Sequence, residues 1–267
     1  MIENTPLTKF EKVLFRSYMT LLEFGNLKKG WINPAEFRIA DEKSRREFKA
    51  VIKAVEEGLP KSKPLIKERW KTFSEFPTCL EGKDNLTNPP FVIAANHYNR
   101  GRLQGLWQAP VMVEAIANII DPKGDTKFRF IMNGHKFTNL SKGIMSNFAK
   151  VFDGITTFQT REIIETLRNG DVLGIFPSAK PDLELNEMDQ KAGSLFLIAG
   201  KRNIPIIPVG AWFDKRENIY RVNIGEPVVF GRTDCLLDNQ TIADAVGIKI
   251  ANLLPENLRG YYQNISV

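Results

Sequence analysis

A histidine that directly follows an apolar run is the residue of this chain best placed for chemistry. His97 comes after Asn96 at the end of the run 91–95, and it is one of two histidines in the sequence. The run predicts a buried strand, and ligands of open α/β sheets bind beyond the carboxyl ends of the strands. Because imidazole exchanges protons near neutral pH, His97 is a candidate general base. The alternative is a polar loop histidine satisfied by the backbone.

Two other predicted strands end in segments that could join His97. The run 172–176 is followed by the segment 177–180, and the run 204–209 contains two prolines. Since parallel strands present their carboxyl ends at one edge of a sheet, we expect these strand ends to converge on one cleft.

Several other chemistries are excluded. Cys79 and Cys235 form no Cys-x-x-Cys pair and the histidines add no ligand spacing, so we expect neither a metal site nor a disulfide framework. The chain has no Gly-x-Ser-x-Gly elbow and no nucleotide-phosphate loop. The 37 Lys and Arg against 31 Asp and Glu favour phosphate-bearing partners. The 18 Phe lie mostly in apolar runs, so they indicate a core and not a nucleic-acid surface.

From residue 72 onward, short apolar runs alternate with longer helical patterns, which is typical of strands joined by crossover helices. The predicted strands are 91–95, 128–132, 172–176 and 204–209, with edge strands at 220–224 and 228–230. The predicted helices are 106–120, 141–151, 163–167, 192–201 and 242–254. We therefore predict an α/β domain over 72–267.

Residues 1–71 are predicted to form a separate helical piece, with helices over 9–24 and 44–59. The first helix combines an apolar stripe with Lys9, Lys12 and Arg16, and a basic segment follows at 61–71. These features favour a peripheral position on an anionic membrane surface. The alternatives are packing against the domain and a solvated helix face. With no signal-peptide pattern and no run of about 18 apolar residues, we expect a cytoplasmic location.

A set of short motifs occurs in a fixed order along the chain, at 82–86, Asn96-His97, 153–155, Phe176-Pro177, Lys191-Ala192-Gly193, 204–209 and 254–262. In type and order, these motifs resemble those of the glycerolipid acyltransferases of the lysophosphatidic acid acyltransferase type. Together they cover roughly residues 75 to 262, and their shared order makes chance resemblance unlikely. The resemblance implies an α/β fold with a mixed, mainly parallel sheet flanked by helices.

The resemblance also implies transfer of a fatty acyl group from a coenzyme A or acyl-carrier-protein thioester to a glycerol phosphate or lysophospholipid hydroxyl. His97 matches the general base of the family. The donor thioester is a co-substrate, and no cofactor is implied. We place six residues in the substrate site. Arg100, Arg102 and Lys180 are expected to bind the substrate phosphate, and Lys180 and Lys191 to contact the phosphate or the pantetheine arm. Asn96 and Ser178 complete the set.

Three positions depart from the family pattern. Arg102 stands where the family has the Asp that orients the histidine, and a guanidinium offers no acceptor for an imidazole N–H. Ser178-Ala179 replaces a Glu-Gly pair, and the arginine of the second block is absent, with Arg161 as the nearest substitute. Two hypotheses follow: an active O-acyltransferase of phospholipid biosynthesis, or a catalytically degenerate relative that binds lipid or acyl ligands.

Overall fold

A computed structural model describes most of the C-terminal part of the chain and two short N-terminal segments. The described residues are 6–17, 53–58, 78–98, 108–120, 126–132, 147, 149, 154–157, 159–178, 182–214, 216–217, 219–231 and 233–265. The chain divides into two compact units, Met1–Phe73 with Ile131–Thr160 and Ser74–Phe130 with Arg161–Val267. The first unit thus adds 131–160 to the predicted N-terminal piece, and the predicted division at 71 and 72 stays a prediction.

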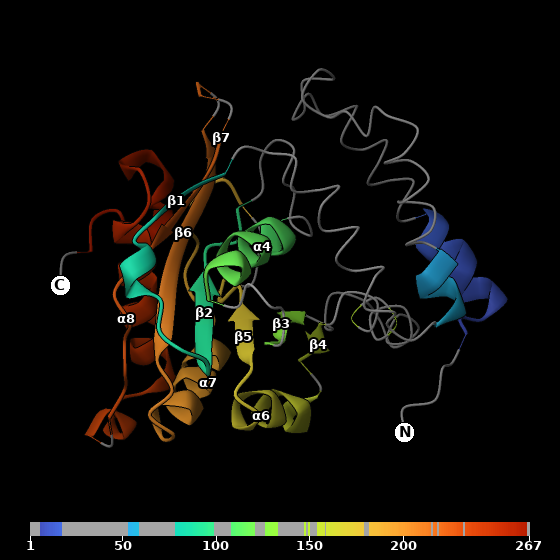
Figure 1. Ribbon diagram of the computed structural model, residues 1–267, viewed down its shortest axis with the longest axis horizontal. Coiled ribbons are helices and arrows are strands. Elements are labelled where there is room, and N and C mark those ends of the chain that lie inside the picture. Colours follow the sequence, from blue (N-terminus) through green and yellow to red (C-terminus); the bar gives the residue numbers. More distant parts are fainter. Residues whose placement is uncertain are drawn as a thin grey trace. The chain divides into compact units, whose positions relative to one another are not determined.

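The described strands form one seven-stranded sheet of order β1-β7-β6-β2-β5-β3-β4 (Figure 1). The strands are β1 (Thr78–Glu81), β2 (Phe91–Ala95), β3 (Phe128–Met132), β4 (Ile155–Thr156), β5 (Val172–Ile175), β6 (Ile206–Asp214) and β7 (Ile219–Ile224). Every neighbouring pair is parallel except β6 with β7. The predicted class, α/β with a mixed and mainly parallel sheet flanked by helices, is confirmed.

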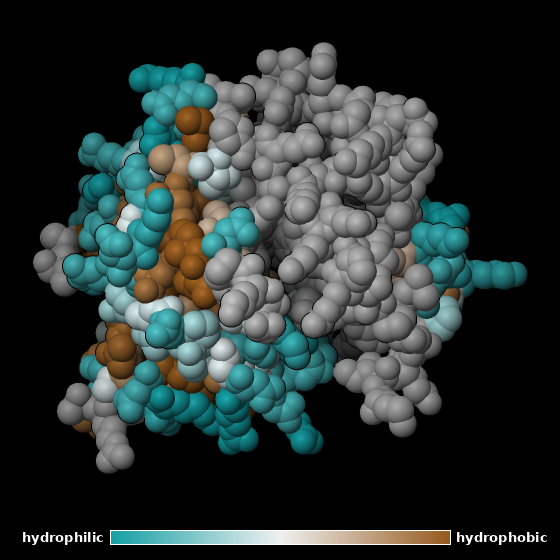
Figure 2. All heavy atoms as spheres, viewed as in Figure 1, coloured by the Kyte–Doolittle hydropathy of each residue, from teal (hydrophilic) through white to brown (hydrophobic). Residues whose placement is uncertain are grey.

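The centre of the sheet is its most buried part. All five residues of β2 are buried, and β2 pairs in parallel with β6 on one side and with β5 on the other. A strand covered on both faces reads as a continuous apolar run, which is why 91–95 was recognisable from sequence. Figure 2 shows apolar residues gathered along the line of β6 and bordered by hydrophilic residues.

Helices connect the strands and cover the sheet. The described helices with assigned bounds are α4 (Gln108–Ile120), α6 (Thr160–Arg168), α7 (Gln190–Gly200) and α8 (Asn239–Asn252). Helix α8 packs against β6 and β2, and α7 packs against α8. Both begin earlier than their apolar periodicity predicts, because Asp189 and Asp238 accept hydrogen bonds from the N–H groups of the first turns.

The predicted strand pattern was wrong at its C-terminal edge. Residues 219–224 form an interior strand between β6 and β1, and Val228 makes an isolated bridge to Ile206 where an edge strand was expected. The short strand β1 was not predicted, because Thr78–Glu81 carries little apolar alternation. Strand β6 starts later than predicted and continues to Asp214, where its pairing with β7 ends.

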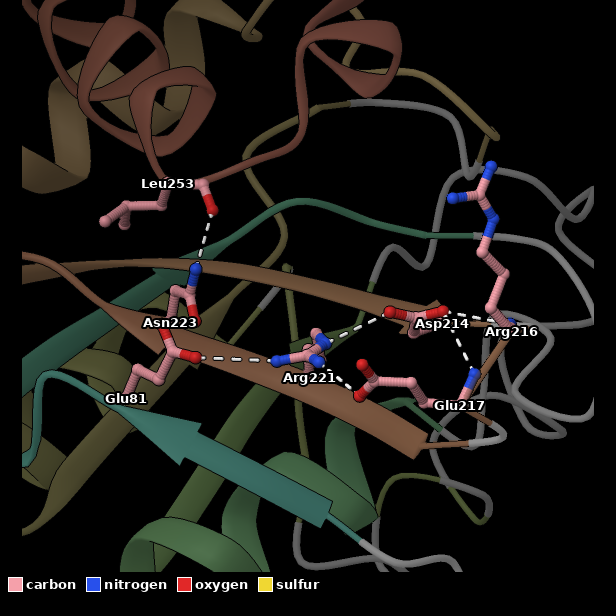
Figure 3. A network of polar contacts seen from close by, with 7 residues as sticks. All are labelled: Glu81, Asp214, Arg216, Glu217, Arg221, Asn223 and Leu253. Atoms are coloured by element: carbon pink, nitrogen blue, oxygen red, sulfur yellow. Dashed lines mark hydrogen bonds and ion pairs between the residues drawn. The ribbon is translucent and has the colours of Figure 1, made fainter.

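A network of ion pairs around one arginine joins the strands β1, β7 and β6 (Figure 3). The Arg221 guanidinium on β7 donates to Asp214, 3.2 Å away, to Glu81, 3.5 Å away, and to Glu217. Burial acts to raise the pKa of Asp214, but hydrogen bonds from two backbone N–H groups and from Arg221 lower it below its ordinary value. Asp214 therefore stabilises the fold above the ordinary carboxyl pKa, and this contribution is lost as pH falls through the lowered value.

Residues 1–73 of the first unit contain two short described helical segments. The helix over 9–17 begins with a capping box in which Thr8 and Glu11 exchange hydrogen bonds. Arg16 binds the Glu56 carboxylate through two nitrogens, at 2.5 and 2.8 Å, and Glu56 is 5% exposed. In the second segment, residues 53–57 are helical and Gly58 forms a turn. The predicted continuations, including the basic segment 61–71, lie outside the described residues.

Candidate functional site

His97 leaves the carboxyl end of β2 at the centre of the sheet. Its side chain is half-buried, and its backbone carbonyl accepts a hydrogen bond of 3.0 Å from the N–H of Asp182. The next residue, Tyr98, is 3% exposed and forms a parallel bridge with the same Asp182. The chain after β2 is therefore held by the loop 182–189, which leads into α7.

The imidazole of His97 lies flat against an aromatic ring from the neighbouring strand end. The ring centroids of His97 and Phe176 are 4.4 Å apart, and the planes differ by 8°. Phe176 directly follows β5 and in turn contacts Phe130 of β3, with centroids 5.4 Å apart. Two predicted strand ends, those of β2 and β5, are thus brought together.

Asn96 fastens the end of β2 to β6. Its carboxamide donates to the carbonyl of Ala211 at 2.9 Å and accepts from the N–H of Ala211 at 2.7 Å, and the residue is 4% exposed. The carboxamide thereby makes the pair of hydrogen bonds that the backbone of a neighbouring strand would make. It does so at the point where β2 ends and β6 continues. The structure gives Asn96 this structural role, and substrate binding by Asn96 stays a prediction.

Ser178 and Lys191 lie on either side of the loop 182–189 in the sequence. Ser178 follows β5, and Lys191 is in the first turn of α7. Ser178 is 5% exposed and forms an antiparallel bridge with Met188. The carbonyl of Pro177 accepts a hydrogen bond from Asp189, the N-cap of α7. Lys191 is exposed on the first turn of α7, and its backbone N–H donates to the Asp189 carboxylate. This pairing brings the end of β5 and the start of α7 together.

The C-terminal tail, residues 254–262, is hydrogen-bonded to the loop 182–189. The N–H of Leu185 donates to the carbonyl of Leu258, and the N–H of Tyr261 donates to the carbonyl of Leu185, both at 2.9 Å. Gly260 adopts φ +48°, and a Cβ there would lie 2.4 Å from the Leu185 carbonyl oxygen, so the close approach requires glycine. The motif at 254–262 therefore positions the loop that pairs with His97.

A buried tyrosine completes this clamp. The Tyr262 hydroxyl accepts from the N–H of Met188 at 3.0 Å and donates to Asp244 at 2.5 Å. Gln240 donates to the carbonyl of Met188 and to Asp244, both at 3.0 Å. Burial, and then the hydrogen bond to Asp244, raise the pKa of Tyr262 far above its ordinary value, so the hydroxyl stays protonated. Sequence reasoning found the tail motif, which includes Tyr262, but missed Gln240 and Asp244, since nothing in their spacing links them to Met188.

The remaining predicted site residues are placed as follows. Arg100, Arg102 and Lys180 lie outside the described residues. Arg161, the nearest substitute for the missing second-block arginine, forms an exposed ion pair with Glu165 on α6. Within the described ranges, no group of three or more His, Cys, Asp or Glu side chains is arranged to hold a metal ion.

No protein-family model and no curated protein matches the sequence. Among solved structures, the chain is similar to the crystal structure of the 1-acyl-sn-glycerophosphate (LPA) acyltransferase PlsC from Thermotoga maritima. The two sequences are 18% identical, the similarity covers 91% of this chain and 96% of that chain, and the TM-score is 0.44.

Proposed function

We propose that the protein transfers a fatty acyl group from an acyl thioester of coenzyme A or acyl-carrier protein to the hydroxyl of a lysophospholipid or glycerol phosphate. The observation that supports this most is the ring contact between His97 and Phe176. It joins two blocks of the acyltransferase-like pattern, Asn96-His97 and Phe176-Pro177, that are far apart in the sequence. The contact lies at the carboxyl edge of the sheet, where ligands of such folds bind.

In the proposed reaction, His97 takes the proton of the acceptor hydroxyl while that oxygen attacks the thioester carbonyl. The new ester C–O bond forms, the C–S bond breaks, and the departing thiolate takes up the proton from the imidazolium. We assign Lys191, exposed at the start of α7, to the acceptor phosphate or the pantetheine arm. We assign Arg100, Arg102 and Lys180 to the phosphate, with Ser178 beside them, and no cofactor takes part.

A second candidate function is lipid or acyl binding without catalysis. It is favoured by Arg102, which replaces the carboxylate that orients the histidine in the acyltransferase pattern. The two functions predict opposite results for Arg102→Asp. In an enzyme that uses Arg102 as a phosphate ligand, the change removes a charged hydrogen bond of about 1.5–3 kcal/mol. In a degenerate relative, it restores the missing acceptor for the imidazole N–H and raises a trace activity.

Release of free thiol from acyl thioesters in the presence of lysophosphatidic acid tests the proposal. We expect turnover by the unmodified protein and a drop in kcat/KM of about tenfold to a hundredfold for Arg102→Asp. Arg202→Asp, the same charge reversal at an exposed position after α7, is the matched control and should retain activity. A gain of activity in Arg102→Asp would favour the degenerate relative, and no thiol release by either protein overturns acyl transfer.

We also propose that the N-terminal helix holds the protein on anionic membrane surfaces from the cytoplasmic side. Phe10, Val13 and Leu14 share one helical face and are 61%, 63% and 39% exposed. Lys9 and Lys12 lie beside them, so the helix offers apolar and basic groups together. No helix in the described segments is long and apolar enough to cross a bilayer.

Vesicle co-sedimentation checks the membrane proposal. Changing Phe10 and Val13 to serine should weaken binding to vesicles that contain phosphatidylglycerol by at least about tenfold, because each side chain gains about 1.5–3 kcal/mol when fully buried. Leu236→Ser is the matched control, since Leu236 is 91% exposed on another part of the chain. Equal sedimentation of the double variant and the unmodified protein would remove the membrane role of this helix.

A further inference from the structure

We propose that Phe176 and Phe130 are positioning residues for His97, so that a stack of three rings from three neighbouring strands fixes the plane of the imidazole. The inference rests on the proposed function for its consequence, because it assumes that the imidazole reacts. It assigns to aromatic packing the orienting task that a carboxylate would perform at position 102. Neither phenylalanine is assumed to touch the reacting atoms.

The stack is built from the sheet itself. Strands β2, β5 and β3 are adjacent and parallel, so the residues at and beyond their carboxyl ends lie at one edge. His97 and Phe176 follow β2 and β5, and Phe130 is the third residue of β3. Their rings meet in that order, with centroid separations of 4.4 and 5.4 Å. His97 and Phe176 are stacked face to face, whereas the planes of Phe176 and Phe130 are tilted by 37°. Each ring is attached to a strand or to a strand end. The hydrogen bonds of the sheet therefore hold the backbones of the three residues in fixed positions relative to one another.

A glycine makes room for the outermost ring. Phe130 pairs with Gly174 across β3 and β5, and a Cβ at Gly174 would lie 2.4 Å from the Phe130 ring. Only a residue without a side chain allows the ring to lie across β5. Phe130 is 6% exposed, so its position is fixed by packing. Gly174, Phe130 and Phe176 therefore form a continuous support beneath His97.

The geometry of the contact suits a histidine that must move a proton. With the planes 8° apart, Phe176 covers a face of the imidazole, whereas both ring nitrogens lie at its edge. Face packing restricts rotation of the side chain without using either nitrogen as a hydrogen-bonding group. A ring held in one orientation needs no reorganisation when the acceptor hydroxyl binds, and misplacement of about 1 Å costs up to about a hundredfold in rate.

Proton NMR of the imidazole tests the stack directly, because the chain has only His97 and His135. In a His135→Asn background, the C–H resonances of His97 should be shifted upfield by the Phe176 ring. Phe176→Leu should move them downfield, and Phe176→Tyr, which keeps the ring, should retain their position. Gly174→Ala, which displaces Phe130, should produce a smaller change in the direction of Phe176→Leu. Phe196→Leu in the core of α7 is the matched control and should leave the resonances in place.

The kinetic consequence is measured on the same variants. Phe176→Leu should lower kcat about tenfold to a hundredfold with little change in KM, and Phe176→Tyr should restore most of it. Unshifted His97 resonances in Phe176→Leu overturn the stack, and shifted resonances with unchanged kcat overturn the positioning role. If the unmodified protein releases no thiol, the proposed function fails, while the NMR result still decides whether the rings hold His97.

Discussion

Replacement of His97 by alanine should lower kcat for acyl transfer by roughly 10² to 10⁴, the contribution expected from a positioned general base. Without the imidazole, the acceptor hydroxyl has no group at the end of β2 to take its proton as it attacks the thioester. Binding of the acceptor phosphate should change little, because we assign it to basic side chains. The expected signature is therefore a loss in kcat with KM nearly unchanged.

The fold should tolerate this substitution. The hydrogen bond from Asp182 reaches the backbone carbonyl of His97, which alanine retains, and the neighbouring Asn96 keeps its two bonds to Ala211. The variant loses the ring contact with Phe176. Far-UV circular dichroism and the urea midpoint should thus stay close to those of the unmodified protein.

His135→Ala is the matched control for this experiment, since it removes the other histidine of the chain. Thiol release should be reduced in His97→Ala and retained in His135→Ala, with several acyl thioesters tested so that chain length does not decide the outcome. Retention of activity within a few-fold by His97→Ala would contradict the assignment of His97 as the base. It would leave the fold and the ring stack untouched.

The sequence predicted the centre of this molecule better than its edge. A continuous apolar run identifies a strand that is covered on both faces, so β2 has its predicted bounds. The mostly apolar strand β3 also has its predicted bounds, although Arg129 interrupts its sequence. Strand β1 is a short edge strand whose pairing with β7 depends on a distant segment. Such pairing leaves no local signal, because the partner supplies the hydrogen bonds and Arg221 supplies an ion pair to Glu81.

The same division holds for the site. The position of His97 followed from one strand and one rule about strand ends, both of which are local in sequence. The clamp on Met188 did not, because Gln240, Asp244 and Tyr262 come from a helix and a tail that only tertiary packing brings to the loop. Asn96 shows a further limit of prediction from sequence. A polar residue beside a candidate base can hydrogen-bond the backbone of β6, and its residue type does not reveal this.

Gly193→Ala should destabilise the fold although it places a better helix former inside a helix. Gly193 lies in α7, where it is buried against the start of α8. A Cβ at this position would lie 1.8 Å from the backbone oxygen of Asn239 and 2.7 Å from its carbonyl carbon. Backbone atoms cannot rotate away as the end of a long side chain can, so the two helices would have to separate.

Two effects of opposite sign decide the outcome. Alanine gains about 1 kcal/mol over glycine in a helix interior. Overpacking of a well-packed contact costs about 1–3 kcal/mol and more where the backbone must move, so we take about 3 kcal/mol here. The net loss is about 2 kcal/mol, which corresponds to a decrease in Tm of about 4–8 °C for a chain of this size.

Urea and thermal unfolding of Gly193→Ala measure this balance, with Ser194→Ala as the control at the next position of the same helix. Ser194 is only half-buried, so its replacement should change stability by no more than about 0.5 kcal/mol. The separation of α7 from α8 should also loosen the clamp, because Gln240 and Asp244 belong to α8 and hold Met188 and Tyr262. A more stable Gly193→Ala would mean that helix propensity outweighs the contact, and the glycine of the Lys191-Ala192-Gly193 block would then not be required for helix packing.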